Sequence, residues 1–269
     1  MLNHFSNQAA GLLGLRRQPG PRMIAVVAHG DEQAELPLLW QLCIALVSLG
    51  YAVTVLDATT DESENNPGLD QILDATHWRD NGHQDAAAWT VFPAGKGIQT
   101  LCEMHHVSGS QTLRQLGHLF PQDGVLILYS KVEWMIALMG NCGVAPLLAV
   151  SPARTSLLTS YLALKRLLIS GALKPTIVNM VPEPDNTSAV APPSPSNSLS
   201  ECARRFLGQE MKTLTIVERH GEDTLNSEIQ GLALRLLESG VSMGVDSFPI
   251  AIDARVTHFG LVDQFAGSH

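Results

Sequence analysis

The run Met-Ile-Ala-Val-Val-Ala at residues 23–28 is the first strand-like segment of the chain. A polar loop follows at residues 29–37, an apolar helical pattern at residues 38–49, and a second apolar run, Val-Thr-Val-Leu-Asp-Ala, at residues 53–58. Uninterrupted apolar strands are typical of parallel sheets, because the crossover helices bury both faces of such a sheet. The stretch therefore predicts a strand, a crossover helix and a parallel strand.

The same alternation continues along the chain. Strand-like runs follow at residues 89–92, 125–129, 146–150 and 176–181, and helical patterns follow at residues 69–73 and 157–168. Strands that alternate with helices in this way build βαβ units. We therefore expect an α/β fold with a doubly wound, mostly parallel sheet flanked by helices.

Composition divides the chain into four parts. Residues 1–20 carry apolar side chains at helical spacing and form a candidate interaction helix, and residues 21–181 hold the alternating core. Residues 182–200 carry five prolines together with Ser and Asn, which favours a flexible loop. Residues 201–269 complete the core and include an amphipathic pattern at residues 225–237.

Charge and apolar content limit the classes of partner. The 269 residues carry a formal net charge of -9, so broad binding to nucleic acid or anionic lipid is not expected. No apolar run reaches the roughly 18 residues that span a bilayer, and the amino terminus has no secretory pattern. The tail at residues 247–269 has one arginine, unlike a basic membrane-surface helix. We expect a cytoplasmic protein whose membrane association is only indirect.

Three further segments, taken with the opening stretch, resemble the MinD/ParA nucleotide-switch ATPases. Pro-Ala-Gly-Lys-Gly at residues 93–97 is similar to the Pro-Ala-Gly-x-Gly turn of that family. Ser-Pro-Ala-Arg-Thr-Ser-Leu at residues 151–157 is similar to its step from strand to helix, and Asn179 ends a strand as an Asn does there. These segments keep the family's order across residues 23–181. The resemblance implies a MinD-like P-loop NTPase fold.

Two segments are similar to one branch of that family, the flagellar-number regulators FlhG and FleN. Ser-Asn-Gln-Ala-Ala-Gly-Leu at residues 6–12 resembles their amino-terminal Asp-Gln-Ala-x-x-Leu-Arg helix, although Asn7 and Leu13 stand where that branch has Asp and Arg. Ala-Arg-Arg-Phe-Leu-Gly at residues 203–208 resembles their Arg-Phe-Leu-Gly stretch. The helix of that branch binds the signal-recognition-type GTPase FlhF. The resemblance implies the same partner here, or other flagellar proteins.

The resemblance also assigns roles within the candidate helix. Gln8 would be the polar contact, Ala9 and Leu12 the packed face, and Arg16 the basic residue that follows a turn later. An ordinary surface helix or a frayed terminus is the open alternative, since terminal segments are commonly disordered.

The loop at residues 29–37 lacks the residues that grip phosphate. A P-loop surrounds phosphate with backbone N–H groups, while a Lys and a Ser or Thr hydroxyl hold the phosphates and Mg²⁺. Aligned on the helix that follows, Ala34 replaces the last Gly, and Glu35 replaces the Lys. Leu36 and Pro37 replace the hydroxyl residues. Leu128 likewise stands where the family has an Asp that is associated with Mg²⁺.

Acidic residues reverse the charge of this loop. Asp31, Glu32 and Glu35 place carboxylates beside Gly30, where a triphosphate would lie, whereas Asp57 matches an acidic residue of the family. Two like charges about 4 Å apart repel by several kcal/mol at an effective dielectric of about 20. The helix dipole contributes only about 0.3–1 kcal/mol. The same carboxylates suit the start of the helix, and we expect Pro37 in its first turn. The loop is therefore expected to be degenerate, with neither ATP nor Mg²⁺ as a cofactor.

No other pattern predicts a catalytic or metal site. His105 and His106 lie in a segment that reads as a polar connection, and neither they nor His77, His83 and His118 have partners at ligand spacing. The four cysteines are widely spaced without a Cys-x-x-Cys pair, which indicates reduced core residues.

Three interpretations of function follow. The leading one is a non-hydrolysing MinD-like regulator of flagellar biosynthesis or placement, which could reach a cell pole through its partners. The second is an atypical MinD/ParA ATPase that uses Lys96 or Lys131 in place of the lost lysine, and the third is a ParA-like accessory of polysaccharide (cellulose) secretion. Because nucleotide generally closes the dimers of this family, the leading interpretation implies a monomer or a nucleotide-independent dimer.

Overall fold

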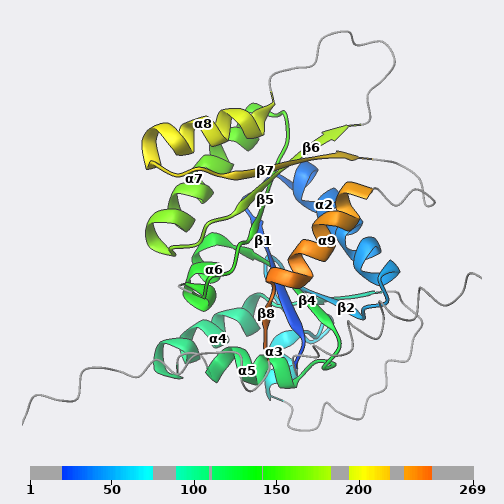
Figure 1. Cartoon of the computed structure of the whole chain (residues 1–269). Coiled ribbons are helices and arrows are strands. Elements are labelled where there is room, and N and C mark those ends of the chain that lie inside the picture. The colour runs from blue at the N-terminus through cyan, green and yellow to red at the C-terminus, as the bar shows by residue number, and fades with distance from the viewer. Residues whose placement is uncertain are drawn as a thin grey trace, which may run out of the picture.

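A computed structural model describes residues 20–74, 89–108, 111–140, 142–182, 194–218 and 227–243. These residues form one sheet with helices on both faces (Figure 1). The strands are β1 (Arg22–Ala28), β2 (Val53–Asp57), β3 (Trp89–Pro93), β4 (Val125–Lys131), β5 (Leu147–Val150), β6 (Thr176–Pro182), β7 (Lys212–Glu218) and β8 (Val241–Ser242). Their order is β3-β2-β4-β1-β5-β6-β7, with β8 antiparallel to β1 and the other pairs parallel. The expected doubly wound, mostly parallel sheet is confirmed.

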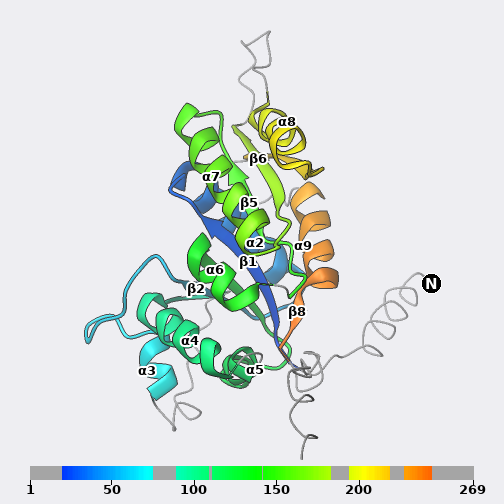
Figure 2. The ribbon, with the colours of Figure 1, turned by 90° about the vertical axis from the view of Figure 1, so that its left-hand side faces the viewer.

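Eight helices lie within the described residues. They are α2 (Glu32–Ser48), α3 (Leu69–Asp74), α4 (Gly95–Ser108), α5 (Gln111–His118), α6 (Val132–Met139), α7 (Arg154–Ser170), α8 (Pro195–Leu207) and α9 (Ser227–Ser239). Helices α2 and α9 cover one face of the sheet, and α4, α6, α7 and α8 cover the other; Figure 2 views the molecule from the side of this second group.

Strand β1 shows why its sequence is uninterruptedly apolar. Met23, Ala25 and Val27 belong to the core beneath α4 and α6, whereas Ile24 and Val26 belong to the core beneath α2 and α9. Side chains alternate between the two faces of a strand, and here helices cover both faces. Every residue of β1 from Met23 to Ala28 is accordingly buried.

The topology opens a crevice at one edge of the sheet. Strands β1 and β4 are neighbours, with Ala28 opposite Lys131, but α2 follows β1 on one face and α6 follows β4 on the other. In open α/β sheets, ligands bind outside the carboxyl ends of strands at such a switch point. The loop between β1 and α2 lies at this edge.

Helix α2 starts earlier than we expected from the sequence. It begins at Glu32, so Pro37 lies inside the helix and not in its first turn. The apolar pattern begins only at Leu38, and the polar residues before it concealed the first turns.

Three other segments also differ from the sequence-based expectation. Helix α8 begins at Pro195, so residues 195–200 are helical and do not form a loop. Proline is tolerated in the first turn of a helix, because the N–H group that it lacks would have no partner within the helix. Helix α4 begins at Gly95, and it includes residues 105 and 106, so His105 and His106 do not lie in a connection. Residues 93–97 therefore end a strand and begin a helix instead of forming a free turn.

The cysteines are free, as the sequence indicated. Cys43 and Cys102 are buried, whereas Cys142 and Cys202 are half-buried. Burial raises the pKa of Cys43 to about 12 and, together with the charge of Glu103, raises the pKa of Cys102 to about 11.

Several sequence-based expectations fall on residues outside the described ranges. They include the candidate helix within residues 1–19, most of the proline-rich segment, His77, His83 and the tail from residue 244. Among the described helices, none combines the length and the apolar character needed to cross a membrane.

Candidate functional site

The crevice at the carboxyl ends of β1 and β4 contains a cleft of about 470 Å³. Its walls come from the loop after β1, the first turn of α2, the end of β4 and the middle of α7. The residues that line it include His29, Gly30, Glu32, Glu35, Tyr129, Lys131, Glu133, Thr159 and Arg166. The loop and the first turn of α2 are continuous, so these walls come from three segments that are far apart in the sequence.

Glu35 lies at the bottom of this cleft and is fully buried. Its Oε1 accepts hydrogen bonds from the backbone N–H groups of His29 and Asp31, both at 2.9 Å. Its Oε2 accepts a hydrogen bond from the hydroxyl of Tyr129. A buried carboxylate is costly unless donors surround it, and these three donors supply that compensation.

The loop conformation makes the two backbone N–H groups converge. Gly30, between His29 and Asp31, has a φ of +92°, a left-handed conformation that glycine adopts without the steric cost of a Cβ atom. Successive N–H groups around such a residue can form a concave anion-binding nest. The carboxylate oxygen of Glu35 lies in this concavity.

His29 supports the loop from the side of β5 and α7. Its side chain is only 2% exposed, and its Nε2 lies 2.7 Å from the carbonyl oxygen of Ala149. Because a carbonyl can only accept, Nε2 carries a proton. Its Nδ1 lies 2.9 Å from Oγ1 of Thr159, and its Nε2 lies 3.4 Å from Oε1 of Glu35.

The other two carboxylates of the loop point elsewhere. Asp31 is buried, and its Oδ2 accepts a hydrogen bond of 3.1 Å from the backbone N–H of Ser151. Glu32 is exposed on the first turn of α2 and lines the cleft. Ala34 is buried and has no polar side chain to offer. The three acidic residues thus lie around one loop but have different partners: Glu35 binds the loop, Asp31 binds Ser151, and Glu32 faces the cleft.

Tyr129 was not singled out from the sequence. Burial, together with the hydrogen bond and the charge of Glu35, raises the pKa of Tyr129 well above its ordinary value. The phenol therefore remains protonated at neutral pH and donates to the carboxylate.

Asp57 ends β2 and is half-buried. Its Oδ1 accepts hydrogen bonds from the backbone N–H and hydroxyl of Thr59, and its Oδ2 accepts one of 2.8 Å from the hydroxyl of Thr60. Its carboxylate therefore shapes the turn that follows β2. Leu128, where the family has an Asp, is buried in β4. Among the described residues no group of three or more potential metal ligands occurs.

The cations near the cleft belong to β4 and α7. Lys131 is exposed at the start of α6 and lines the cleft, and Arg166 forms an ion pair with Glu133. Lys96 is not among the lining residues; its backbone N–H bonds to Glu62 at the start of α4. Of the two lysines considered as replacements, only Lys131 reaches the site.

The Arg-Phe-Leu-Gly stretch forms the end of α8. Gly208 closes the helix in a left-handed conformation with a φ of +64°, and Arg204 pairs with Glu201 one turn earlier. Phe206 is 69% exposed.

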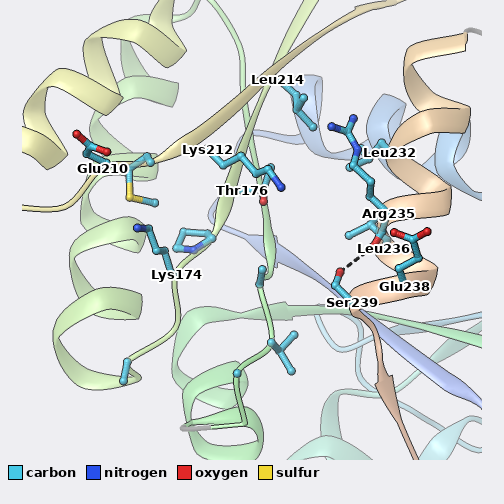
Figure 3. Close-up of a pocket in the computed structure, with 16 residues that line it drawn as sticks. Lys174, Thr176, Glu210, Lys212, Leu214, Leu232, Arg235, Leu236, Glu238 and Ser239 are labelled. Carbon is cyan, nitrogen blue, oxygen red and sulfur yellow. Dashed lines mark hydrogen bonds between the residues drawn. The ribbon is translucent and has the colours of Figure 1, made fainter.

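A second groove, of about 930 Å³, lies at the opposite ends of the strands (Figure 3). Thr176 and Lys212, the first residues of β6 and β7, lie in its middle, and Arg235 extends from α9. Its charged side chains are Lys174, Lys212, Arg235, Glu210 and Glu238. Because it lies away from the loop after β1, it is separate from the cleft.

Comparisons with known proteins support the fold. No protein-family model and no curated protein matches the chain. A cobyrinic acid a,c-diamide synthase from Mycobacterium smegmatis matches with a TM-score of 0.51 and 13% identity over 81% of this chain and 94% of that chain. The same enzyme with bound ADP and magnesium matches with a TM-score of 0.52 and 13% identity over 81% and 96%. A ParA family ATPase from Chlorobium tepidum TLS matches with a TM-score of 0.47 and 13% identity over 81% and 99%.

At 13% identity such likenesses describe the fold alone. The chain shares the α/β fold of the cobyrinic acid a,c-diamide synthase, a mostly parallel sheet flanked by helices.

Proposed function

We propose that this chain is a non-hydrolysing MinD-like regulator of flagellar biosynthesis or placement, which acts through protein–protein contacts. The observation that carries the first half of this proposal is the charge of the loop. Residues 29–37 contain three carboxylates and neither a lysine nor an arginine. Glu35, in the position of the phosphate-gripping lysine, points into the loop.

A nucleoside triphosphate would meet two obstacles in this cleft. Its phosphates would have to displace the carboxylate of Glu35 from the N–H groups of His29 and Asp31. They would also lie beside the charge of Glu32 on the cleft wall. Repulsion between like charges at about 4 Å reaches several kcal/mol near a protein surface, more than one helix dipole offsets.

The second half of the proposal rests on the resemblance to FlhG and FleN. Gln8, Ala9, Leu12 and Arg16 form the candidate contact with an FlhF-type GTPase, and they lie outside the described residues. The exposed Phe206 on α8 supports a second contact surface. A scaffold without its own ATP cycle would present both surfaces at all times.

The test is GTP hydrolysis by an FlhF-type GTPase from the same organism. The intact chain should stimulate hydrolysis, whereas Gln8→Ala and a chain truncated before Leu15 should not. Gln18→Ala is the matched control, because it makes the same substitution outside the motif, and it should stimulate like the intact chain. If the rate of GTP hydrolysis is the same with the intact chain, with each variant and with neither, the flagellar assignment is wrong.

One observation favours the atypical ATPase as a second candidate. Lys131 is exposed and lines the cleft, so its ammonium group could face a phosphate there. In that case Lys131→Ala should abolish binding of Mg-ATP, and the same change at Lys96, outside the cleft, should not.

A further inference from the structure

The three donors around Glu35 come from two separate parts of the chain, the loop after β1 and the end of β4. They are the N–H of His29 in the loop, the N–H of Asp31 at the start of α2, and the hydroxyl of Tyr129 at the end of β4. All three point at one carboxylate that has no solvent exposure. A small oxyanion in the same place would accept the same hydrogen bonds.

Helix capping explains only part of this arrangement. A glutamate in the first turn often bonds back to the N-cap N–H, which here belongs to Asp31. Capping does not require the N–H of His29, which lies outside the helix, or the hydroxyl of Tyr129 from another strand. Nor does it require complete burial, since such a cap works at the surface.

The surroundings of the carboxylate also suit an anion. The N–H groups of the 17-residue helix α2 direct their positive ends toward the loop. The protonated Nε2 of His29 lies 3.4 Å from Oε1. These features are typical of an anion-binding site, and the anion that occupies it is the carboxylate of Glu35.

We propose that the loop after β1 is a preserved oxyanion site whose permanent ligand is the carboxylate of Glu35. The site takes the carboxylate in place of phosphate, and it accepts a small inorganic oxyanion such as phosphate once that carboxylate is removed. This inference rests on the proposed absence of a nucleotide cycle, because an internal ligand keeps the loop filled without ATP.

Removal of the side chain has a definite consequence. Glu35→Ala leaves two backbone N–H groups and one hydroxyl without an acceptor, and unsatisfied buried donors are costly. Glu35 lines the cleft, so the vacated space is open to solutes from that side. An anion that binds there restores the lost hydrogen bonds, and it stabilises the folded chain by mass action.

The experiment measures thermal unfolding of the full chain in inorganic phosphate against chloride at matched ionic strength. Glu35→Ala should melt below the wild type in chloride, and saturating phosphate should raise its midpoint by roughly 2–4 °C. Glu32→Ala is the matched control, because it removes the same charge from the same helical turn without freeing either N–H. The wild type and Glu32→Ala should show no phosphate-specific shift.

The position of the bound phosphate is tested by NMR of ¹⁵N-labelled protein. In Glu35→Ala the amide resonances of His29 and Asp31 should move with phosphate concentration. A folded Glu35→Ala that shows neither a melting shift nor these resonance changes would overturn the inference. If Glu35→Ala does not fold in chloride, circular dichroism in saturating phosphate decides: recovery of the folded state supports the inference, and a chain that stays unfolded overturns it.

The two proposals can fail separately. Stimulation of the GTPase by the intact chain, combined with a folded Glu35→Ala that binds no phosphate, would retain the flagellar role and reject the internal ligand. Phosphate rescue of Glu35→Ala, combined with no effect on the GTPase, would retain the internal ligand and reject the flagellar role.

Discussion

The carboxylate of Glu62 joins two helix starts. Its side chain is 1% exposed, and its Oε1 accepts hydrogen bonds from the backbone N–H of Asp70 at 3.1 Å and of Gly97 at 3.0 Å. Its Oε2 accepts one of 2.7 Å from the N–H of Lys96. One side chain thus caps α3 and α4 together, and nothing in the local sequence around Glu62 announces this role.

Replacement of Glu62 should therefore destabilise the fold. We expect Glu62→Ala to lower the free energy of unfolding by about 3 kcal/mol, because hydrogen bonds to a charged group are the stronger kind and three donors lose their acceptor. Glu64→Ala, two residues away and exposed, should change it by less than about 0.5 kcal/mol. Urea denaturation of both variants checks this, and equal losses would contradict it.

Tyr129 should make stability depend on alkaline pH. Burial and Glu35 raise its pKa in the folded chain, whereas the unfolded phenol ionises near about pH 10. The stability that the protonated phenol contributes is intact below about pH 10, and it is lost as the pH rises above that value.

The difference in unfolding free energy between wild type and Tyr129→Phe should therefore shrink above about pH 10. This comparison cancels the alkaline titration of Cys43 and Cys102, which both proteins share. Denaturation curves measured from pH 8 to about 11.5 test it, and a constant difference over that range would mean that Tyr129 does not hold its proton through Glu35.

Part of the candidate site could be predicted from the sequence. Glu35 is recognisable as the replacement for a lysine, because the loop and helix align locally with a known pattern. Tyr129, which lies 94 positions further along the chain, is not recognisable in this way, nor is the role of His29, whose partner Thr159 lies 130 positions away. Contacts of that separation depend on the register of the sheet, which no local pattern encodes.

Among the helices, two glycines in α8 and α9 should behave oppositely. Gly208 ends α8 with a φ of +64°, and Gly231 lies within α9, where an added methyl group would meet no atom of another element within 4 Å. Gly208→Ala should lower the free energy of unfolding by about 1 kcal/mol, because a side chain disfavours the left-handed conformation. Gly231→Ala should raise it by about 0.5–1 kcal/mol, since alanine is the better helix former. Thermal unfolding of the pair distinguishes the signs, and two shifts of equal sign would be the contrary result.

Strands were easier to predict than helices in this chain. The strands buried on both faces are uninterrupted apolar runs, so β1, β2 and β4 were located to within a residue or two from sequence. Helix α6 is almost entirely apolar, so its sequence shows no alternation of polar and apolar residues at helical spacing. Helix α8 begins at a proline in a segment whose composition is typical of a loop. The first turns of α2 and α8 consist mostly of polar residues or prolines, which resemble a loop in composition. The starts of both helices were therefore predicted too late in the sequence.

At the scale of the whole molecule, the absence of a nucleotide cycle affects assembly. In the resembled family, nucleotide closes the dimer, so a chain that binds none should not change its mass with ATP. Light scattering with and without Mg-ATP should give the same mass, whether that of a monomer or of a nucleotide-independent dimer. A doubling of mass that depends on ATP would contradict the internal ligand and the proposed function together.

The most direct test of the central claim is a calorimetric titration of the intact wild-type chain with Mg-ATP. If Glu35 fills the loop and the acidic residues repel phosphate, no saturable heat should appear up to about 1 mM nucleotide, which corresponds to a binding free energy weaker than about -4 kcal/mol. Saturable one-to-one binding at micromolar concentration would show that the loop after β1 still holds a triphosphate, and the account of a self-occupied, non-hydrolysing scaffold would have to be abandoned.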